Sequence, residues 1–468
     1  MDNPPQVFVV VGLGFGDEGK GTIVDFLTHQ HHCGLVIRFN GGPQAAHHVV
    51  TNDGNVHCFS QFGSGMFFPN VVTYLSKHML VAPTNLLREA EALRKVGVPD
   101  VMKRIFIDPE CTVVTPLHKL VGRIQEIARG SEKHSTTGLG VGVAVLDRKQ
   151  SPSISITLKD GFKPELLFEK LSRMNDSKNR LVEDLISNTS DPTAREAILK
   201  VVDELSVETD PGPMTQSLEN FVASYEENIQ PEEQFLPPHF SSQANIIFEG
   251  AQGVLLDPTH GFPPYVTKTD CTLGNAQEII TKYNHHHLVR NIGVTRAYMT
   301  RHGNGPLPTE DLSLSTVIND QHNKTSYWQG PMRYGWLDLV LLRHAINVVG
   351  KVDSLAITNL DCVPLLPQFK VCLSYQIQGR NHEEYQFPDM NEKRTEVVQA
   401  SRPSKWINFQ LWRDPSNSSS SDPLSEELIT FVDFIQSPLG LDHPIQLLSF
   451  GPKRVDKVDL RDGRSVVS

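Results

Sequence analysis

A glycine-rich loop that carries two carboxylates and a lysine lies near the start of the chain. It spans Gly12–Thr22, reads GLGFGDEGKGT, and directly follows the apolar run Val7–Val11. Glycines allow backbone N–H groups to close around a phosphate, and Lys20 can reach the outer phosphates of a nucleotide. The spacing meets the first part of the P-loop pattern, although Gly21 stands where that pattern has Ser or Thr. The loop therefore predicts a site for nucleotide phosphates.

The two carboxylates inside this loop, Asp17 and Glu18, indicate more than phosphate binding. An anion beside a nucleotide repels its phosphates, so a carboxylate here favours a chemical role. It could accept a proton next to the phosphate that is transferred, or it could hold Mg2+. The structural alternative for Asp17 is a charge that the dipole of the following helix stabilises.

Composition and charge restrict the possible classes of function. The chain has 468 residues, of which 39% are hydrophobic and 21% charged, with a net charge of −11. It contains no strongly basic block, and no apolar stretch reaches the roughly 18 residues of a membrane span. No signal peptide is visible, and the six cysteines are scattered, which is typical of free thiols in a reducing compartment. We therefore expect a cytoplasmic protein that binds neither nucleic acid nor membrane.

Strand and helix signals alternate, which predicts an α/β fold with a large, mainly parallel sheet flanked by helices. Strands are expected at 7–11, 34–39, 103–108, 244–248, 288–294, 355–358 and 371–377, and helices at 22–29, 85–96, 116–128 and 337–349. Residues 163–235 are polar and helical in pattern and predict a helical subdomain within a single domain, 1–468. The serine-rich residues 413–422 predict an exposed loop.

Five further segments have the density of Gly, His and Gln that is typical of a binding site. They are Asn40–His48, Thr136–Gly142, Phe248–Asp257 with its continuation Pro264–Thr267, Thr300–Glu310 and Gly335–Asp338. Together with the first loop, and in the same order, these segments resemble the adenylosuccinate synthetase family. The resemblance runs from about Val7 to Arg454, which is nearly the whole chain.

The resemblance implies a GTP-dependent carbon–nitrogen ligase of AMP biosynthesis. Enzymes of this family are cytoplasmic homodimers that use GTP and Mg2+ to phosphorylate the 6-oxygen of IMP; the amine of L-aspartate then displaces the phosphate. By this resemblance Asp17 is the base at N1 of the purine, and Lys20 stabilises the transferred phosphoryl group. His47 is a donor near the β- and γ-phosphates of GTP, and Gln252 helps to hold the 6-oxygen in line.

The resemblance also implies which residues bind IMP and Mg2+. IMP is expected to contact Gln44, Thr137, Gln252 and Thr267. Mg2+ is expected to be held by Asp17 and by the backbone carbonyl of Ala46.

For GTP, the resemblance points to a carboxylate that reads guanine. Asp361 matches the family's acceptor for two N–H groups of guanine, and adenine would leave it unpaired. GTP rather than ATP is therefore expected. Further GTP contacts are implied at Gly16, Glu18, Gly19, Gly21, Ser449, Gly451 and Pro452.

The sequence departs from the family pattern where the amino acid binds. The family's Arg-rich segment reads Gln329–Asp338 here, so its first Arg, which grips the aspartate carboxylates, is Gly330. Its second Arg, near GTP, is Met332, and only Arg333 remains as an amino-acid-binding candidate, unless Arg301 or Lys268 substitutes. A desolvated Arg–carboxylate fork is worth a few kcal/mol, so its loss should weaken aspartate binding by orders of magnitude.

A second set of departures concerns the nucleotide and the dimer. In the segment around Thr137, family residues Arg, Pro and Tyr are Leu139, Val143 and Val145. The Arg that crosses the dimer to the partner's IMP phosphate falls near Ser151, where no Arg stands. The catalytic role of a homodimer is therefore open.

Three functions are compatible with these residues. The first is an ordinary synthetase with rearranged substrate loops. The second keeps GTP-driven activation but uses another amine or another purine nucleotide. The third is a regulator that binds GTP or a purine nucleotide with little catalysis; the retained Asp17 and His47 argue against it, because a binding module needs neither base nor acid.

Overall fold

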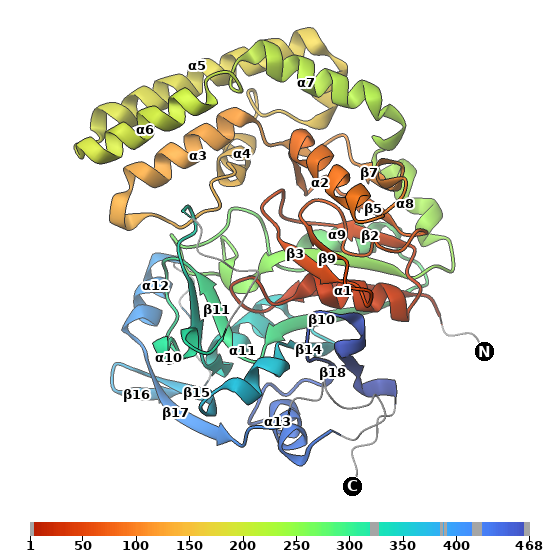
Figure 1. Ribbon diagram of the computed structural model, residues 1–468, viewed down its shortest axis with the longest axis vertical. Coiled ribbons are helices and arrows are strands. Elements are labelled where there is room, and N and C mark those ends of the chain that lie inside the picture. Colours follow the sequence, from red (N-terminus) through yellow and green to blue (C-terminus); the bar gives the residue numbers. More distant parts are fainter. Residues whose placement is uncertain (1–3, 319–326, 384–386, 388–390, 414–423, 463–468) are drawn as a thin grey trace.

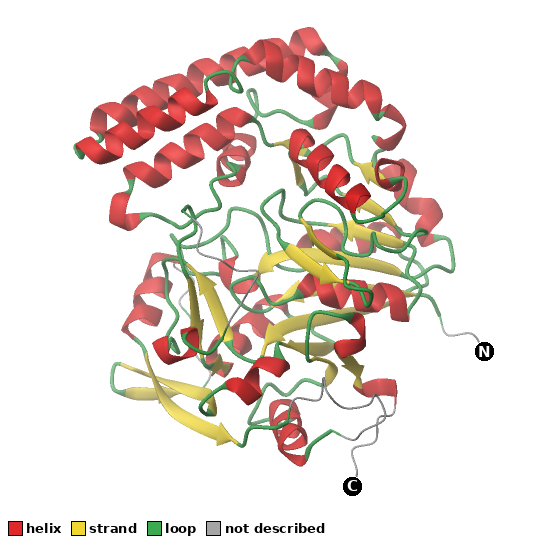
Figure 2. Ribbon diagram, viewed as in Figure 1, coloured by secondary structure: helices red, strands yellow, loops and turns green. Residues whose placement is uncertain are grey.

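The structure is a computed structural model that describes residues 4–318, 327–383, 387, 391–413 and 424–462. Its centre is a nine-stranded sheet with the order β19-β18-β14-β10-β1-β9-β2-β5-β7, in which all neighbours except β18 and β19 run parallel. The prediction of an α/β fold with a large, mainly parallel sheet is confirmed (Figure 1, Figure 2). Its strands are β1 (Gln6–Gly12), β2 (Leu35–Arg38), β5 (Val72–Leu75), β7 (Ile105–Ile107), β9 (Ile246–Gly253), β10 (Leu288–Arg296), β14 (Ser354–Thr358), β18 (Ile445–Ser449) and β19 (Lys457–Asp459).

Strand β1 lies at the centre of this sheet because it is apolar on both faces. Residues 7–10 are at most 1% exposed. A parallel strand that is covered on both sides needs a continuous apolar run rather than an alternating one. Val9 lies between Phe248 of β9 and Asn291 of β10, so the first loop leaves the sheet at its middle.

The motif-bearing segments follow the carboxyl ends of parallel strands. The first loop follows β1, and the segment that begins at Asn40 follows β2. Gln252 stands near the end of β9, Asp361 follows β14, and Ser449 ends β18. Because the carboxyl ends of parallel strands share one edge of a sheet, this topology gathers residues that are far apart in the sequence.

Helices cover the sheet and form a further layer. Figure 1 shows α3 to α7 as a layer above the sheet, whereas α10, α11 and α12 lie to the left of β10 and β14 and α13 lies below these strands. The range 163–235 contains α5, α6, α7 and the start of α8, in agreement with its helical pattern. The helices are α1 (Lys20–Gln30), α2 (Pro83–Lys95), α3 (Pro116–Ala128), α4 (Val141–Gln150), α5 (Pro164–Asn188), α6 (Pro192–Leu205), α7 (Pro211–Ser224), α8 (Glu232–Phe240), α9 (Gly274–Tyr283), α10 (Leu312–Ser315), α11 (Leu339–Val349), α12 (Asn391–Ala400) and α13 (Glu426–Gln436).

Two expected elements differ in the structure. The strand expected at 371–377 is part of β15 (Phe369–Ile377), which joins a second sheet with β13 (Leu337–Asp338), β16 (Arg380–His382) and β17 (Arg402–Phe409). The helix expected at 337–349 begins at Leu339, because the Asp338 carboxylate caps it by accepting from the N–H groups of Val340 and Leu341.

Several short strands were not expected from the sequence. The hairpin of β3 (His47–Val50) and β4 (Val56–Phe59) carries His47. Strand β11 (Met299–His302) pairs with β12 (Met332–Gly335), and β6 (Leu80–Val81) pairs with β8 (Thr112–Val113). These strands are short, and two of the pairs position site residues.

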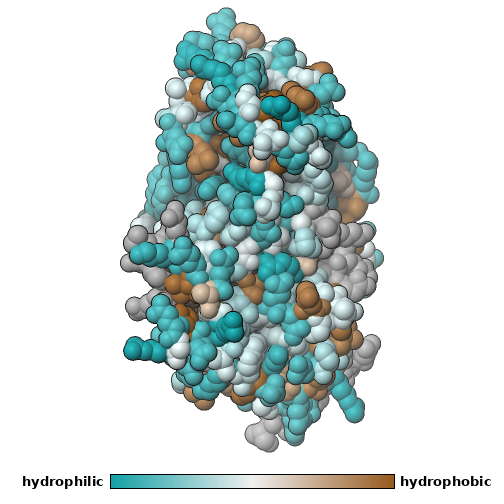
Figure 3. Space-filling view, turned by 90° about the vertical axis from the view of Figure 1, so that its left-hand side faces the viewer, coloured by the Kyte–Doolittle hydropathy of each residue, from teal (hydrophilic) through white to brown (hydrophobic). Residues whose placement is uncertain are grey.

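The helices, the surface and the cysteines can be compared with the expectations from composition. In the described part of the chain, no helix is long and apolar enough to cross a membrane. On the face in Figure 3, hydrophobic residues form small scattered groups among hydrophilic ones. The six cysteines are free, as expected. Of the predicted exposed loop 413–422, residues 414–422 lie outside the described residues.

Replacement of Gly253 by Ala should disturb the contact between the end of β9 and the first loop. A Cβ atom at this position would lie 2.2 Å from the carbonyl oxygen of Gly14 and 2.3 Å from Oε1 of Glu18. Because backbone must move to relieve this overlap, we expect Gly253→Ala to lower the free energy of unfolding by about 1–3 kcal/mol. Thermal unfolding of the purified variant measures this effect.

Gly34→Ala is the matched control, since it makes the same change at the opposite edge of the sheet. A Cβ atom at Gly34 would meet only the Cβ of Ala244, at 3.9 Å. We expect its melting temperature to equal that of the wild type. A Gly253→Ala variant that is equally unaffected would contradict the close packing of the loop on β9.

Candidate active site

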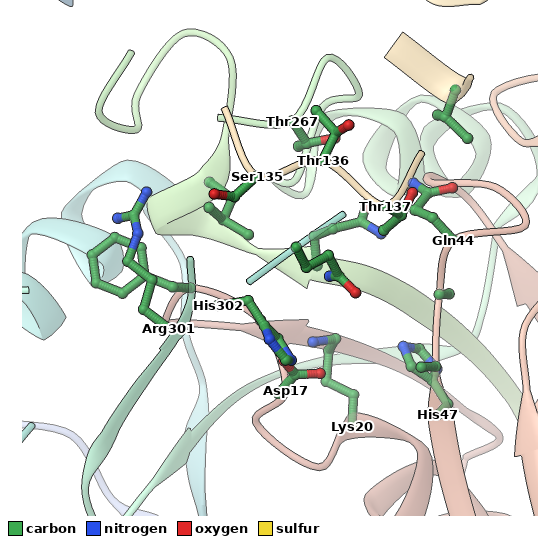
Figure 4. A pocket seen from close by; sticks show the side chains of 18 of the residues that line it. Asp17, Lys20, Gln44, His47, Ser135, Thr136, Thr137, Thr267, Arg301 and His302 are labelled. Atoms are coloured by element: carbon green, nitrogen blue, oxygen red, sulfur yellow. The ribbon is translucent and has the colours of Figure 1, made fainter. Parts of the chain in front are cut away.

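Loops at the carboxyl edge of the sheet enclose a cavity of about 770 Å³. In Figure 4, Asp17, Lys20, His47 and His302 lie on one side of this cavity, and Thr136, Thr137, Thr267 and Gln44 lie on the other. The residues predicted from the sequence that line it are Gly16, Asp17, Gly19, Lys20, Gly21, Gln44, Ala46, His47, Thr137, Gln252, Thr267, Asp361, Ser449, Gly451 and Pro452. The side chains of Glu18 and Arg333 do not line it.

The side chain of Glu18 is turned into the first loop. It is 2% exposed, and its Oε1 accepts hydrogen bonds from the backbone N–H groups of Gly14, at 3.0 Å, and Gly16, at 2.8 Å. Its Oε2 forms an ion pair with Nζ of Lys20 at 2.5 Å. A direct contact between the Glu18 carboxylate and GTP is therefore not compatible with this geometry, because the carboxylate is already bound by the loop.

The start of α1 is the part of the first loop that remains open to an anion. Helix α1 begins at Lys20 without a side-chain cap, behind Gly19 in the left-handed conformation (φ 83°). Uncapped N–H groups at a helix N-terminus favour a phosphate. Gly21 has no room for a side chain, since a Cβ atom there would lie 2.6 Å from Cβ of His47. This contact explains why the loop lacks the Ser or Thr of the P-loop pattern.

Asp17 faces the cavity from a turn with an unusual backbone conformation. Its φ is 59°, in the left-handed region that non-glycine residues rarely adopt, and its carbonyl oxygen accepts a hydrogen bond from Nε of Arg296 at 2.5 Å. Oδ2 lies 3.5 Å from Nε2 of His302, at the end of β11. The side chain of Asp17 is 26% exposed, so its carboxylate can accept a proton from a ligand in the cavity.

His47 is held by a buried carboxylate. Its Nδ1 lies 2.5 Å from Oε1 of Glu249, a fully buried residue of β9 that also accepts hydrogen bonds from the hydroxyl and N–H groups of Ser64. Because Glu249 is an acceptor, Nδ1 is the donor and Nε2 is the ring nitrogen left for a ligand. This pairing fixes the orientation of the imidazole.

The titration of this pair follows from burial and charge. Burial lowers the pKa of His47 to about 4, although the hydrogen bond and charge of Glu249 oppose the shift. Burial also raises the pKa of Glu249, but the charge of Arg38 and the hydrogen bonds from His47 and Ser64 outweigh this and hold it at about 2. In the protein without ligand, an ionised Glu249 thus faces a neutral His47.

Gln252 and Gln44 supply amide groups to the cavity. Gln252 has a left-handed backbone (φ 57°), and its Oε1 accepts from the hydroxyl of Thr269 at 3.3 Å. The same hydroxyl lies 3.2 Å from that of Thr267. Both amide atoms of Gln44 are buried and have no hydrogen-bond partner among the described residues, which leaves them available for a polar ligand.

The residues expected at guanine lie at a further part of the cavity wall. Asp361 follows β14, and Ser449, Gly451 and Pro452 follow β18. The turn after β18 is held by Lys457, whose Nζ donates to the carbonyl oxygen of Gly451 at 2.7 Å. Burial lowers the pKa of this ammonium to about 7, although nearby carboxylates, including Asp361, oppose the shift. The carboxylate of Asp361 is thus near enough to this ammonium to interact with it electrostatically.

The guanidinium group of Arg333 is engaged by other groups of the protein. Its guanidinium donates to the carboxylate of Glu310 and to the carbonyl oxygens of Gly303 and Gly305. Arg301 is similarly committed to three carbonyl oxygens and stacks 4.2 Å from the ring centroid of Phe15. Both side chains fix the loop after β11, so amino-acid binding by Arg333 stays a prediction that these contacts do not favour.

Trp328, which directly precedes the segment Gln329–Asp338, packs against the segment Thr136–Gly142. A Cβ atom at Gly138 would lie 2.8 Å from its indole ring, and the guanidinium carbon of Arg123 lies 5.0 Å from the ring centroid. An aromatic ring here closes space rather than offering donors to a carboxylate.

A comparison with protein families identifies the family of this chain. The sequence model described as "Adenylosuccinate synthetase" matches residues 9–458. The chain belongs to the adenylosuccinate synthetase family. GTP-dependent ligation of IMP and aspartate is the known activity of this family.

Curated relatives are adenylosuccinate synthetases over nearly their whole length. The chain is 31% identical over 460 residues to the protein of Chlorobium chlorochromatii, with 97% of each chain covered. It is 31% identical over 475 residues to that of Paraburkholderia phytofirmans, with 98% of this chain and 97% of the relative covered. The resemblance inferred from the motifs is thus confirmed.

Two solved structures share the fold. Fully ligated adenylosuccinate synthetase from Plasmodium falciparum has a TM-score of 0.79 and 23% identity, covering 97% of this chain and 99% of that chain. The succinoaminodeoxyadenylate synthetase of cyanophage S-2L, bound to dGMP and dATP, has a TM-score of 0.54 and 15% identity, covering 98% and 96%. At these identities the likeness shows the fold alone.

Sequence reasoning missed three residues of the site. Glu249 lies within a recognised motif, but only the fold brings it to His47 across 202 positions of sequence. His302 and Lys268 were not assigned to the nucleotide site, although each adjoins a motif residue: His302 follows Arg301, and Lys268 follows Thr267. Adjacency to Thr267 was the available signal for Lys268.

The His47–Glu249 pair should make the protein less stable as the pH falls. His47 has a folded pKa of about 4, below the 6.5 of the unfolded chain, so stability present above pH 6.5 is lost on acidification toward pH 4. The folded pKa of Glu249, about 2, extends this loss below pH 4.5. We expect His47→Asn to reduce the slope of unfolding free energy against pH, between 6.5 and 5, by at most about 1.4 kcal/mol per pH unit.

Denaturant unfolding at a series of pH values measures this slope. His285→Asn is the control, because the side chain of His285 is exposed. We expect the control to keep the wild-type slope. A His47→Asn variant with an unchanged slope would show that the pair does not titrate as described.

Proposed function

We propose that this protein uses GTP to activate the 6-oxygen of IMP and joins an amine, by family resemblance L-aspartate, to give adenylosuccinate. The observation that carries the proposal is that Asp17, Lys20, His47 and Gln252 line one cavity in a chain of this family. A base, a cation and an oriented imidazole around one cavity are the groups that phosphoryl transfer to a purine oxygen requires.

The proposed reaction has two steps. Asp17 accepts the proton from N1 of IMP, which places negative charge on the 6-oxygen. This oxygen bonds to the γ-phosphorus of GTP, and the bond from that phosphorus to the bridging oxygen breaks, leaving GDP. The amine then bonds to C6 and loses one proton, and inorganic phosphate leaves with the former 6-oxygen and takes up that proton. Lys20 and the N–H groups at the start of α1 balance the charge of the phosphoryl group.

His47 acts on the phosphate side in this proposal. Its Nε2 is free while Nδ1 is bonded to Glu249. A polyphosphate at Nε2 would favour the imidazolium, since negative charge would then lie on both sides of the ring. His47 therefore takes up a proton when GTP binds, and becomes the donor that the family resemblance implies.

The residues present fit Mg2+ together with substrate phosphates. Mg2+ is commonly held by one or two carboxylates plus phosphate oxygens, and it would neutralise phosphate charge here. Asp17 is 26% exposed to the cavity, and Ala46 is an exposed lining residue whose carbonyl the family resemblance assigns to the metal. A homodimer and a cytoplasmic location, both typical of the family, are part of the same proposal.

A second candidate keeps the GTP-driven step but uses an amine other than aspartate. It is favoured by the commitment of Arg333 and Arg301 to groups of the protein itself and by Gly330 and Met332 at the family's Arg positions. With these guanidinium groups engaged, a substrate with two carboxylates would be desolvated without strong compensation. The fold also does not fix the nucleotide, since the cyanophage enzyme is bound to dGMP.

The first test is phosphate release from GTP in the presence of IMP, Mg2+ and amine. We expect Asp17→Asn, which keeps the side-chain shape and removes the base, to lower this rate by about 10²–10⁴-fold. GTP binding measured without Mg2+ should change little, because the phosphates are held by Lys20 and backbone groups. The matched control is Asp433→Asn, an exposed residue of α13, which should keep the wild-type rate.

The outcome separates catalysis from binding alone. Loss of the rate with intact GTP affinity supports Asp17 as the base. A wild-type protein that binds GTP and IMP but releases no phosphate with any amine would overturn the enzymatic proposal in favour of a regulator.

An amine panel separates the two candidate reactions. If the second candidate is correct, ammonium, glycine or asparagine should stimulate IMP-dependent phosphate release more than aspartate at the same concentration. The measurement is initial rate against amine concentration, with the purine product followed by absorbance. Saturation by aspartate at a low concentration, with the other amines inactive, would leave only the first candidate.

A further inference from the structure

Among the described Lys and Arg side chains that line the cavity, one does not donate a hydrogen bond to a carboxylate or carbonyl oxygen of the protein. Five Lys and Arg side chains line the cavity in the described part of the chain: Lys20, Arg129, Lys268, Arg296 and Arg301. Four of them donate to carboxylate or carbonyl oxygens of the chain. No carboxylate or carbonyl oxygen of the described residues accepts a hydrogen bond from the ammonium of Lys268, which is half-buried.

Lys268 lies against the N-terminus of a helix. A Cβ atom at Gly142 would lie 3.3 Å from Cγ of Lys268, so the lysine stem runs along the first turn of α4. Helix α4 begins at Val141 without a side-chain cap, behind Gly140 in the left-handed conformation (φ 85°), and residues 140–143 line the cavity. Its uncapped N–H groups and the ammonium therefore border the same space.

Hydroxyl groups complete this end of the cavity. Thr267 directly precedes Lys268, and Figure 4 shows Thr267, Thr136 and Thr137 on the side opposite Asp17 and Lys20. The loop that carries Thr137 is fixed, since Glu126 accepts from the N–H of Thr136 at 3.3 Å. Ammonium, hydroxyl and helix N–H groups are all donors, which is the set that a phosphate dianion requires.

The charge at this end is positive. The carboxylate of Glu126 is neutralised by Arg129, whose Nη1 lies 2.6 Å from its Oε1. Burial, together with the charges of Arg129 and Lys149, lowers the pKa of Lys268, so this ammonium lies in a field without a compensating anion. An anionic ligand would relieve that repulsion.

We propose that Lys268 supplies the cation for the 5′-phosphate of the purine monophosphate, beside the N-terminus of α4 and beside Thr137 and Thr267, which the family resemblance already assigns to IMP. The proposal rests on the proposed function, whose nucleotide it anchors. It places the phosphate at one end of the cavity and the reacting 6-position near Asp17 at the other. The anchoring cation comes from the same chain as the base, so the absence of an Arg near Ser151 does not leave the phosphate without a cation.

The test compares binding of IMP with binding of inosine, which lacks the phosphate. Isothermal titration of the full chain gives both dissociation constants. Lys268→Met keeps the apolar stem and removes the charge, so IMP binding should weaken about 10–100-fold while inosine binding stays within about twofold. Lys268→Arg should restore most of the IMP affinity.

Lys163→Met is the matched control, since it removes one positive charge at an exposed position away from the cavity. It should leave both dissociation constants unchanged. Equal weakening of IMP and inosine by Lys268→Met, or unchanged IMP binding, would overturn the role of Lys268.

If the wild-type protein does not bind IMP, the same comparison is made with GMP and guanosine and with dGMP and deoxyguanosine. Binding of one of them with the same loss in Lys268→Met would support the anchor while overturning IMP as substrate. Binding of none of the three monophosphates would overturn both proposals.

Discussion

The buried ion pair between Glu18 and Lys20 is the interaction on which the site depends. Taking two charges out of water is costly, and only a full set of hydrogen bonds offsets that cost. Here the carboxylate is satisfied by Lys20 and by the backbone N–H groups of Gly14 and Gly16. The loop is therefore shaped before any nucleotide arrives, with Asp17 turned outward to the cavity and the start of α1 left open. Close packing at Gly253 joins this arrangement to the neighbouring strand.

The cavity separates two kinds of chemistry. On one side lie Asp17, Lys20, His47 and His302, which can move a proton and balance a transferred phosphoryl group. On the other lie threonine hydroxyls, the N-terminus of α4 and Lys268, all of which can donate to a phosphate. This separation matters because an acceptor next to a phosphate would repel it, while a base must remain an acceptor. The family's reaction needs both environments within the length of one nucleotide.

The departures from the family pattern fall on one side of the site, where the family has arginines, and the structure shows what the remaining side chains contact there. The guanidinium groups that remain near the lost Arg positions hold loop carbonyls and Glu310, and Trp328 packs against Gly138. The proton-transfer side, in contrast, is intact and supported by a buried carboxylate beneath His47. In the proposed reaction, different elements therefore carry the selection of the amine and the activation of the purine.

Local patterns in the sequence determined the parts of this protein that depend on neighbouring residues: the buried strand β1, the glycine loop, the bounds of α3 and the helical range 163–235. Helix α3 matches its expected bounds because Pro116 and the Thr115 cap specify its start locally. The motif order also sufficed to assign the family.

Tertiary structure decided the rest. It turned the Glu18 carboxylate inward, committed Arg333 to Glu310, placed β15 in a second sheet, and set Glu249 beneath His47. Among the described residues, it also left Lys268, beside α4, without an acceptor for its ammonium. These outcomes depend on which donors and acceptors the fold brings within hydrogen-bond distance, and sequence spacing carries no such information for residues that lie hundreds of positions apart.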